Sequence, residues 1–157
     1  MSAVIGGDIT QVAEVLGRQP PVSCINSKSS IGFTALIYAA DLGYIAIVKE
    51  LLKHGANPNI GNKYGVTALM MASVNGYTNI VIELIKNKAD PNLANKYGVT
   101  PLMYASRTGY IDVIEVLLKY GANPNVRDNN NITALFIAQK KNRDVVAEKL
   151  KEAGAKL

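Results

Sequence analysis

Few side chains in this chain of 157 residues could perform chemistry alone. It has one histidine, His54, and one cysteine, Cys24, well separated in the sequence. A cysteine nucleophile needs a base beside it, and a structural zinc site needs about four ligands, mainly Cys and His. We therefore interpret His54 as a solvated residue near a helix C-terminus, and Cys24 as a free thiol in a loop. The sequence predicts no enzyme, no metal site and no cofactor.

Phosphate-binding and paired-carboxylate chemistry is not indicated either. Gly6-Gly7 is not followed by Gly-Lys-Ser or Gly-Lys-Thr, so the pair does not match a phosphate-binding loop. Asp90, Asp112 and Asp128 fall at predicted turns or helix starts, where capping explains them. No apolar run approaches the ~18 residues that a membrane helix needs. With a single cysteine, these features predict a soluble monomer of a reducing compartment, the cytoplasm or the nucleus.

The residues that must build the fold recur with a fixed period. Several residue types return every 33 positions from Thr34 onward. This period is typical of repeat proteins, in which one unit cannot bury its own apolar side and stacks against its neighbours. The recurring sets are Thr34, Thr67, Thr100 and Thr133; Leu36, Leu69, Leu102 and Leu135; Ala39, Ala72, Ala105 and Ala138; and Pro58, Pro91 and Pro124.

Each unit contains signals for two helices and a turn. Thr67 is a predicted N-cap, and Gly76 is predicted to end that first helix in a left-handed conformation. A second helix is predicted around Ile80–Ile85, where apolar residues at i, i+1, i+4 and i+5 share one face. Asn62–Gly65 and Asn95–Gly98 have Asx at the first position and Gly at the fourth, which favours a type I turn.

This pattern resembles the ankyrin repeat. The likeness rests on Gly65–Leu69, Ala89–Asn92, Gly98–Leu102 and Gly121–Asn125. The resemblance implies an all-α repeat solenoid of stacked helix-turn-helix units with protruding β-hairpin-like loops. We expect a single ankyrin repeat domain over residues 1–157. Its parts are a partial N-terminal capping repeat at 1–31, full repeats at 32–64, 65–97 and 98–130, and a C-terminal capping repeat at 131–157.

The two ends differ from the middle of the array. Gly7–Leu16 aligns with Gly43–Leu52, so we expect it to form the second helix of an unfinished first repeat. Pro20-Pro21 predicts an extended connection after it. The last helix carries Lys149 and other charged residues where the preceding units are apolar. A terminal repeat lacks one neighbour, so a more polar face is expected there.

The chain departs from the family at one repeated position. The family usually places His after the Thr-Pro-Leu triplet, where it helps to bond adjacent loops. The corresponding residues here are apolar, so we expect apolar packing to replace polar bonds between adjacent loops. These residues are Ile37, Met70, Met103 and Phe136.

Two sets of tyrosines have different predicted roles. Tyr44, Tyr77 and Tyr110 each follow a glycine, and we expect them to pack between successive second helices. Tyr64 and Tyr97 lie inside the turns, where little core is available to cover them. Contact with a partner and stacking between loops are both open for this pair.

The resemblance places partner contacts on a concave groove of loops and first helices. Helical spacing and the turn positions together select a candidate strip along the array. It holds five basic side chains and one acidic one, with an apolar, aromatic N-terminal end. The strip consists of Phe33, Asp41, Leu42, Lys63, Tyr64, Val66, Val74, Asn75, Lys96, Tyr97, Val99, Arg107, Thr108, Lys140 and Lys141.

The sequence therefore predicts a non-enzymatic protein-protein interaction module, an adaptor or scaffold. The expected partner is a protein segment with apolar anchors and acidic residues, because complementary charge speeds and orients association. The alternative is binding of nucleic acid or another polyanion through the basic C-terminal half of the strip. The net charge of +5 permits acidic partners without requiring them.

Overall fold

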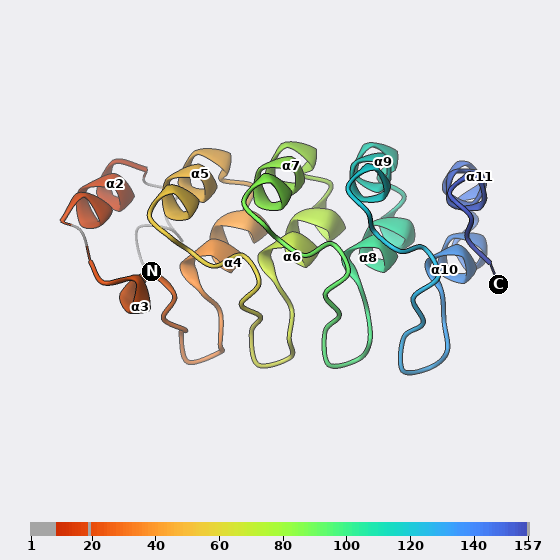
Figure 1. The fold of residues 1–157 in the computed structure, drawn as a ribbon, viewed down its shortest axis with the longest axis horizontal. Helices are drawn as coiled ribbons and strands as arrows, with labels where there is room; N and C mark the ends of the chain where they lie inside the picture. Colours follow the sequence, from red (N-terminus) through yellow and green to blue (C-terminus); the bar gives the residue numbers. More distant parts are fainter. Residues whose placement is uncertain (1–8, 19, 157) are drawn as a thin grey trace.

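The computed structural model describes residues 9–18 and 20–156, which form a row of helix pairs (Figure 1). All regular elements in this described part are helices. They are α2 (Ile9–Gly17), α3 (Val22–Ile25), α4 (Ala35–Asp41), α5 (Ile45–Lys53), α6 (Ala68–Asn75), α7 (Thr78–Lys86), α8 (Pro101–Thr108), α9 (Ile111–Lys119), α10 (Ala134–Lys140) and α11 (Asp144–Glu152).

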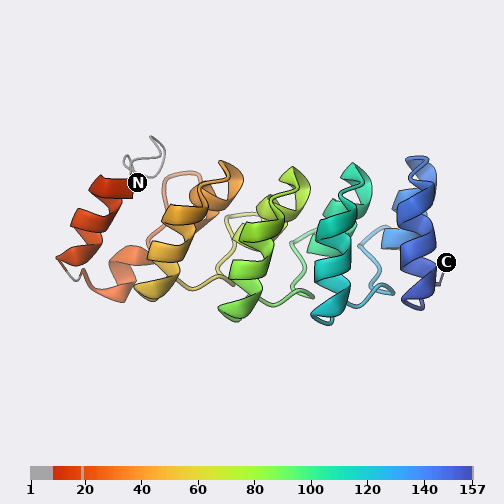
Figure 2. The ribbon, with the colours of Figure 1, turned by 90° about the horizontal axis from the view of Figure 1, so that it is seen from above.

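The helices form two parallel layers. The first helices of the repeats, α4, α6, α8 and α10, form one layer, and the second helices, α2, α5, α7, α9 and α11, form the other (Figures 1 and 2). Four loops project from the layer of first helices, away from the second helices. The stacked helix-turn-helix architecture is therefore confirmed, and the protruding loops are hairpin-like in shape without regular strand in the described residues.

Threonine caps start every first helix. The Oγ1 atoms of Thr34, Thr67, Thr100 and Thr133 accept hydrogen bonds from the backbone N–H three residues later, at 3.2–3.4 Å. Each cap satisfies an amide that the helix leaves without a partner, a contribution of about 1 kcal/mol. The N-cap predicted at Thr67 is confirmed, and the threonines at the equivalent positions cap their helices in the same way.

The core follows the repeat period. The four recurring alanines, at 39, 72, 105 and 138, are 0% exposed, because first helices pack closely against one another there. Ile80, Val81 and Leu84 are buried on α7, as the apolar face predicted. Neither helix of a repeat could bury these side chains alone, so the array is held by contacts between neighbours.

Left-handed residues end the helices and turn the chain. Gly76 (φ 77°) and Gly109 (φ 91°) end α6 and α8, as predicted. Asn142 (φ 54°) adopts the same region at the equivalent turn after α10, and Lys88 (φ 70°) does so at the turn that ends the second helix α7. A lysine there pays a steric cost that glycine does not.

The N-terminal segment adds one more helix to the layer of second helices. Helix α2 packs against α5 in the layer of second helices, while Gly7 and Asp8 lie outside the described residues. Pro21 is extended (ψ 142°), as predicted, and a short helix follows it. Cys24 is therefore not in a loop: it is exposed on α3, because the inserted residues after Pro21 form a turn of helix.

An asparagine ladder connects the units on the side of the loops that follow the second helices. In each rung the Asn Nδ2 donates to a carbonyl 29 residues later, and the Oδ1 accepts a backbone N–H 31 residues later, at 2.7–3.4 Å. The rungs are Asn26, Asn59, Asn92 and Asn125. The first rung ties the N-terminal segment to the same ladder as the full repeats.

Candidate functional site

Buried asparagines shape the loop tips. The Oδ1 of Asn62 accepts hydrogen bonds from the N–H groups of Tyr64 and Val66, at 2.8 and 3.0 Å. Its carbonyl accepts from Gly65 at 2.9 Å, which closes the predicted turn. Asn95 repeats these bonds in the next unit. Since each Asn is under 10% exposed, the tip conformation is fixed before any partner arrives.

Adjacent tips bond to one another through the backbone. The Lys96 N–H donates to the Tyr64 carbonyl at 2.9 Å, and the Asn129 N–H donates to the Tyr97 carbonyl at 3.0 Å. The Asn129 Nδ2 also donates to the Lys96 carbonyl. The expectation that apolar packing replaces polar bonds between loops is therefore wrong in part, because backbone groups supply bonds that do not depend on the missing histidines.

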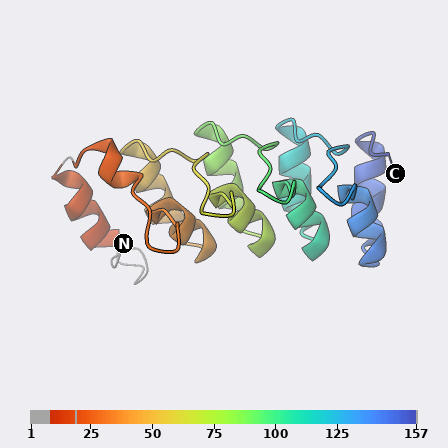
Figure 3. The same ribbon diagram turned by 90° about the horizontal axis from the view of Figure 1, so that it is seen from below.

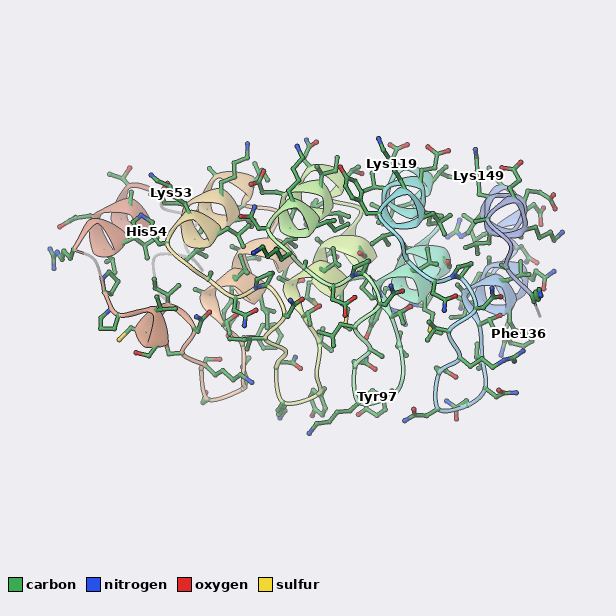
Figure 4. The ribbon with its side chains drawn as sticks, viewed as in Figure 1. Lys53, His54, Tyr97, Lys119, Phe136 and Lys149 are labelled. Atoms are coloured by element: carbon green, nitrogen blue, oxygen red, sulfur yellow. The ribbon has the colours of Figure 1, made fainter. Side chains whose placement is uncertain are left out.

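The two turn tyrosines stack and stay open to solvent. The ring centroids of Tyr64 and Tyr97 are 6.4 Å apart at an interplanar angle of 25°. The residues are nevertheless 45% and 55% exposed, and Tyr97 lies at the far end of its loop (Figure 4). The Lys63 ammonium lies 5.0 Å from the Tyr64 ring centroid. Stacking between loops and availability to a partner thus coexist.

The first helices, seen beside the loops in Figure 3, carry the second part of the strip. The Asn75 Nδ2 donates to the carbonyl and carboxylate of Asp41, at 3.1 and 3.0 Å, which links two repeats. Arg107 is exposed, and its guanidinium lies 5.3 Å from the ring centroid of Tyr104. Sequence reasoning missed Tyr104, whose hydroxyl accepts from Asn95 at 3.1 Å; its spacing of nine residues from Asn95 carried no signal.

The remaining strip residues differ in exposure. Leu42 and the lysines of the strip are exposed, whereas the others are partly buried. Phe33 packs against Tyr38 with ring centroids 5.0 Å apart, so part of its side chain is covered within the protein. The Thr108 hydroxyl donates to its own helix. The partly buried members are Phe33, Asp41, Val66, Val74, Asn75, Val99 and Thr108.

Charge is distributed unevenly between the two layers. The second helices hold eight acidic and six basic side chains, and the rest of the chain holds four acidic and eleven basic ones. Every ion pair between described residues uses a carboxylate of a second helix. None of these pairs includes the strip cations, which are Lys63, Lys96, Arg107, Lys140 and Lys141.

The three described acids that lie off the second helices, Asp41, Asp90 and Asp128, are used internally. Asp41 accepts from Asn75. The Oδ1 of Asp90 accepts the Asn92 N–H at 2.8 Å, and the Oδ1 of Asp128 accepts from two backbone amides, as their predicted turn role requires. These carboxylates are therefore committed to loop geometry, and the surface beside the loops keeps a net positive charge.

His54 belongs to a surface cluster at the end of α5 (Figure 4). Its Nε2 lies 3.0 Å from the Glu50 Oε1, and the Lys53 ammonium lies 3.3 Å from the same atom. The hydrogen bond from Lys53, with His54 assisting, lowers the pKa of Glu50 from its ordinary value, although partial burial opposes this. No group of three potential metal ligands occurs among residues 9–18 and 20–156.

Tyr77 and Tyr110 are placed differently from the prediction, whereas Tyr44 is partly buried against the core. The ring of Tyr77 lies over Gly43, and that of Tyr110 lies over Gly76, so close that a Cβ on either glycine would be within 2.8 Å of the ring. The rings therefore lie beside the turns between helices, not between successive second helices. Tyr77 and Tyr110 remain 37% and 44% exposed, although each ring contacts the preceding repeat.

The comparisons with known proteins agree with this geometry. Curated relatives include NAD-capped RNA hydrolase NUDT12 from Macaca fascicularis, Pongo abelii and Homo sapiens, each 42% identical over 57 residues. The match covers 36% of this chain and 12% of each relative, so it spans a small part of those proteins. No helix in the described part is long and apolar enough to cross a membrane. The family "Ankyrin repeats (3 copies)" matches residues 1–95, 55–128 and 81–157, and the chain belongs to that family.

Proposed function

We propose that this chain is a non-enzymatic protein-protein interaction module that binds a partner segment through the strip. The observation that carries the proposal is the separation of charge. Cations and tyrosine rings are exposed along the loops and first helices, while the ion pairs between described residues lie on the second helices. Ankyrin repeats generally serve as protein-interaction modules.

The chemistry of the strip defines the partner. Tyr64 and Tyr97 offer rigid aromatic surface, a residue type enriched among the side chains that dominate binding energy. Lys63 and Lys96 lie beside them, and Arg107 follows on α8. We propose a segment with apolar anchors that contact the rings and acidic residues that meet the cations, since complementary charge raises the association rate and sets orientation.

The expected setting and the lack of catalysis are part of the same proposal. A monomer in the cytoplasm or nucleus fits a chain with one exposed thiol, because a reducing compartment keeps that thiol free. The likeness to an NAD-capped RNA hydrolase covers 12% of that protein. We therefore expect NAD-capped RNA to stay intact when it is incubated with this chain, and release of the cap would contradict the proposal.

The test compares two surfaces of one molecule. Random dodecapeptides displayed on phage are selected against the wild-type chain, and the affinity of the selected peptides is measured by fluorescence anisotropy. The triple variant Tyr64→Ala, Tyr97→Ala, Arg107→Ala should weaken binding at least about tenfold, which is about 1.4 kcal/mol. The matched control Lys53→Ala, Lys119→Ala, Tyr120→Ala removes exposed cations and a ring from the second-helix side and should leave affinity unchanged.

Both variants should retain the wild-type circular dichroism spectrum, because the altered side chains are not part of the buried core. Selected peptides that bind the strip variant as tightly as the wild type would remove the strip from consideration.

The unpaired cations also support polyanion binding as a second candidate. Titration of a fluorescent single-stranded RNA between 50 and 200 mM salt distinguishes the two. A steep fall in affinity with salt is the signature of phosphate contacts, because binding releases counterions. We expect weak RNA binding that the selected peptides displace.

A further inference from the structure

Two neighbouring loops differ in one hydrogen bond of a buried side chain. Asn62 and Asn95 hold equivalent places, and the Oδ1 atom of each accepts the same two backbone amides of its turn, at 2.8–3.0 Å. Asn62 is 8% exposed and Asn95 is 7% exposed. Because backbone N–H groups can bond only to the oxygen of an amide side chain, both planar groups are fixed alike. Their Nδ2 atoms therefore point toward the same place in each unit.

The two Nδ2 atoms differ in what they meet there. The Nδ2 of Asn95 donates to the hydroxyl of Tyr104 on α8, at 3.1 Å. One repeat period earlier, on α6, the equivalent residue is Met71, which has no oxygen on its side chain. Among residues 9–18 and 20–156, no acceptor bonds to the Asn62 Nδ2. A nearly buried donor without an acceptor is costly, so this place favours a ligand that supplies the missing oxygen.

The Asn62 amide can be reached from outside through a narrow opening. In the described part of the chain, every fully enclosed nitrogen or oxygen of a buried side chain has a hydrogen-bond partner. The unpartnered Nδ2 of Asn62 therefore reaches the surface, although the residue as a whole is more than nine-tenths buried. The end of a side chain fits such an opening, as the Tyr104 hydroxyl does at Asn95. A backbone carbonyl, flanked by its own side chains, fits it poorly.

Charge beside Asn62 favours a carboxylate over a neutral oxygen. Lys63 follows Asn62 directly, Lys96 lies on the adjoining tip, and both are exposed. No described carboxylate forms an ion pair with either lysine. Asp41, the acid of the strip, already accepts from Asn75. A carboxylate is therefore attracted by the cations and accepts a stronger hydrogen bond from the amide than a hydroxyl does.

We infer that Asn62 is a specificity-determining donor of the strip, and that its Nδ2 binds the carboxylate of an aspartate or glutamate side chain in the partner segment. The inference rests on the proposed function, because Asn62 lies between residues of the strip. The partner supplies above α6 the acceptor that Tyr104 supplies above α8. A segment without that carboxylate leaves the donor unpaired, and this is what discriminates between partners.

The direct test observes the Asn62 side chain by NMR in the full chain labelled with ¹⁵N. The probe is the peptide Ac-Val-Asp-Val-NH2. The controls are Ac-Val-Asn-Val-NH2, which has a neutral acceptor, Ac-Val-Ala-Val-NH2, which has only backbone carbonyls, and Ac-Val-Ala-Val-OH, which has a terminal carboxylate. We expect the probe to shift the Nδ2 resonances of Asn62 and to leave those of Asn95 in place. Equal shifts at Asn62 with any control would overturn the inference.

A pair of variants with the same charge tests the donor itself. Asn62→Asp removes the N–H donors and keeps an oxygen for the turn. Asp128 accepts the equivalent two amides at 2.9 Å, so the tip should keep its conformation. Asn95→Asp adds the same charge to the next tip, where the donor is already used by Tyr104. The affinity for the probe, read from the Val66 amide, should be at least about tenfold lower in Asn62→Asp than in Asn95→Asp. Equal losses would show that charge alone acts and would overturn the inference.

A second pair of variants supplies the acceptor from within the chain. Met71→Tyr places a phenol hydroxyl where Tyr104 lies one repeat later, so it should bond to the Asn62 Nδ2 and exclude the probe. Met71→Phe adds the ring without the oxygen and is the matched control. We expect the probe to bind Met71→Tyr at least about tenfold more weakly than Met71→Phe. Equal affinities would contradict the role of the Asn62 donor.

Failure of this inference is distinguishable from failure of the proposed function. The phage-selected peptides report on Tyr64, Tyr97 and Arg107, whereas the tripeptide probe reports on Asn62. Selected peptides that lose affinity in the triple variant but keep it in Asn62→Asp would leave the strip in place and overturn this inference alone.

Discussion

Met103 and Phe136 occupy the same place in consecutive repeats, yet one is sealed in the stack and the other faces solvent. Both follow a threonine cap by three residues, and both amides donate to that cap. The local structure is therefore the same, and the environment differs because a further repeat packs over Met103, while none among the described residues packs over Phe136. In a linear array, burial is decided by the neighbour rather than by residue type or helix position.

The largest test of this contrast removes side chains from both places. Met103→Ala should lower the free energy of unfolding by about 3 kcal/mol, because it empties a fully buried site between repeats. Phe136→Ala should cost less than about 1 kcal/mol, since much of the ring is already hydrated. Urea denaturation followed by circular dichroism measures both. Equal losses would show that the last repeat is covered in solution.

Two glycines extend the contrast to the backbone. Gly76 (φ 77°) and Gly121 (φ 87°) are both left-handed. A Cβ at Gly76 would lie 2.7 Å from the Tyr110 ring, whereas a Cβ at Gly121 would have no neighbouring atom within 4 Å. In both alanine variants the left-handed conformation destabilises the folded state by about 1–2 kcal/mol. Gly76→Ala should lower the free energy of unfolding further, because the new Cβ must displace the Tyr110 ring. A melting temperature no lower than that of Gly121→Ala would contradict the close contact.

A stabilising change comes from the turn after α7. Lys88 has φ 70°, where the neighbouring repeats have Gly55 and Gly121. Lys88→Gly removes the strain of a side chain in the left-handed region and should raise stability by about 1 kcal/mol. The Asn59 Nδ2 donates a hydrogen bond to the Lys88 carbonyl, and glycine at this position keeps that backbone carbonyl. Thermal unfolding of the two chains at equal concentration checks the sign; a lower melting temperature would be the contrary result.

The smallest effect concerns pH on the second-helix side. The pKa of Glu50 is lowered, chiefly by its hydrogen bond with Lys53. A lowered folded pKa means that this contribution is present above the ordinary value of 4.5 and is lost as pH falls through the folded value. The melting temperatures of the wild type and Glu50→Gln should therefore converge as pH falls through the lowered pKa of Glu50. A gap that widens toward low pH would reverse the assigned sign.

The repeat period made the fold predictable from the sequence. Thr67, Gly76 and the apolar face of α7 are local signals, and each recurs often enough to exclude coincidence. The pairing of loops was less predictable. The missing histidines suggested apolar packing, but the Lys96 amide and the Tyr64 carbonyl form the bond, and backbone groups are present whatever the side chain.

The sequence predicted on which side of the array the candidate residues lie, but not which of their side chains touch one another. The spacing placed Arg107 and Tyr97 on one side of the array, and both are exposed there. The stacking of Tyr64 on Tyr97 depends on how far apart adjacent tips lie, which spacing alone does not set. The positions of Tyr77 and Tyr110 were predicted wrongly, because a ring directly after a glycine can fold back over the glycine of the preceding repeat.

The asparagine ladder has a consequence for how such a chain can change in length. Each rung needs only a carbonyl 29 residues ahead and an amide 31 residues ahead, and every unit supplies both. Excising or duplicating one whole unit in frame would restore the same connections across the new junction. The molecule is thus modular in its hydrogen bonding as well as in its helices. The number of repeats can therefore change without any change to the residues that bond one repeat to the next.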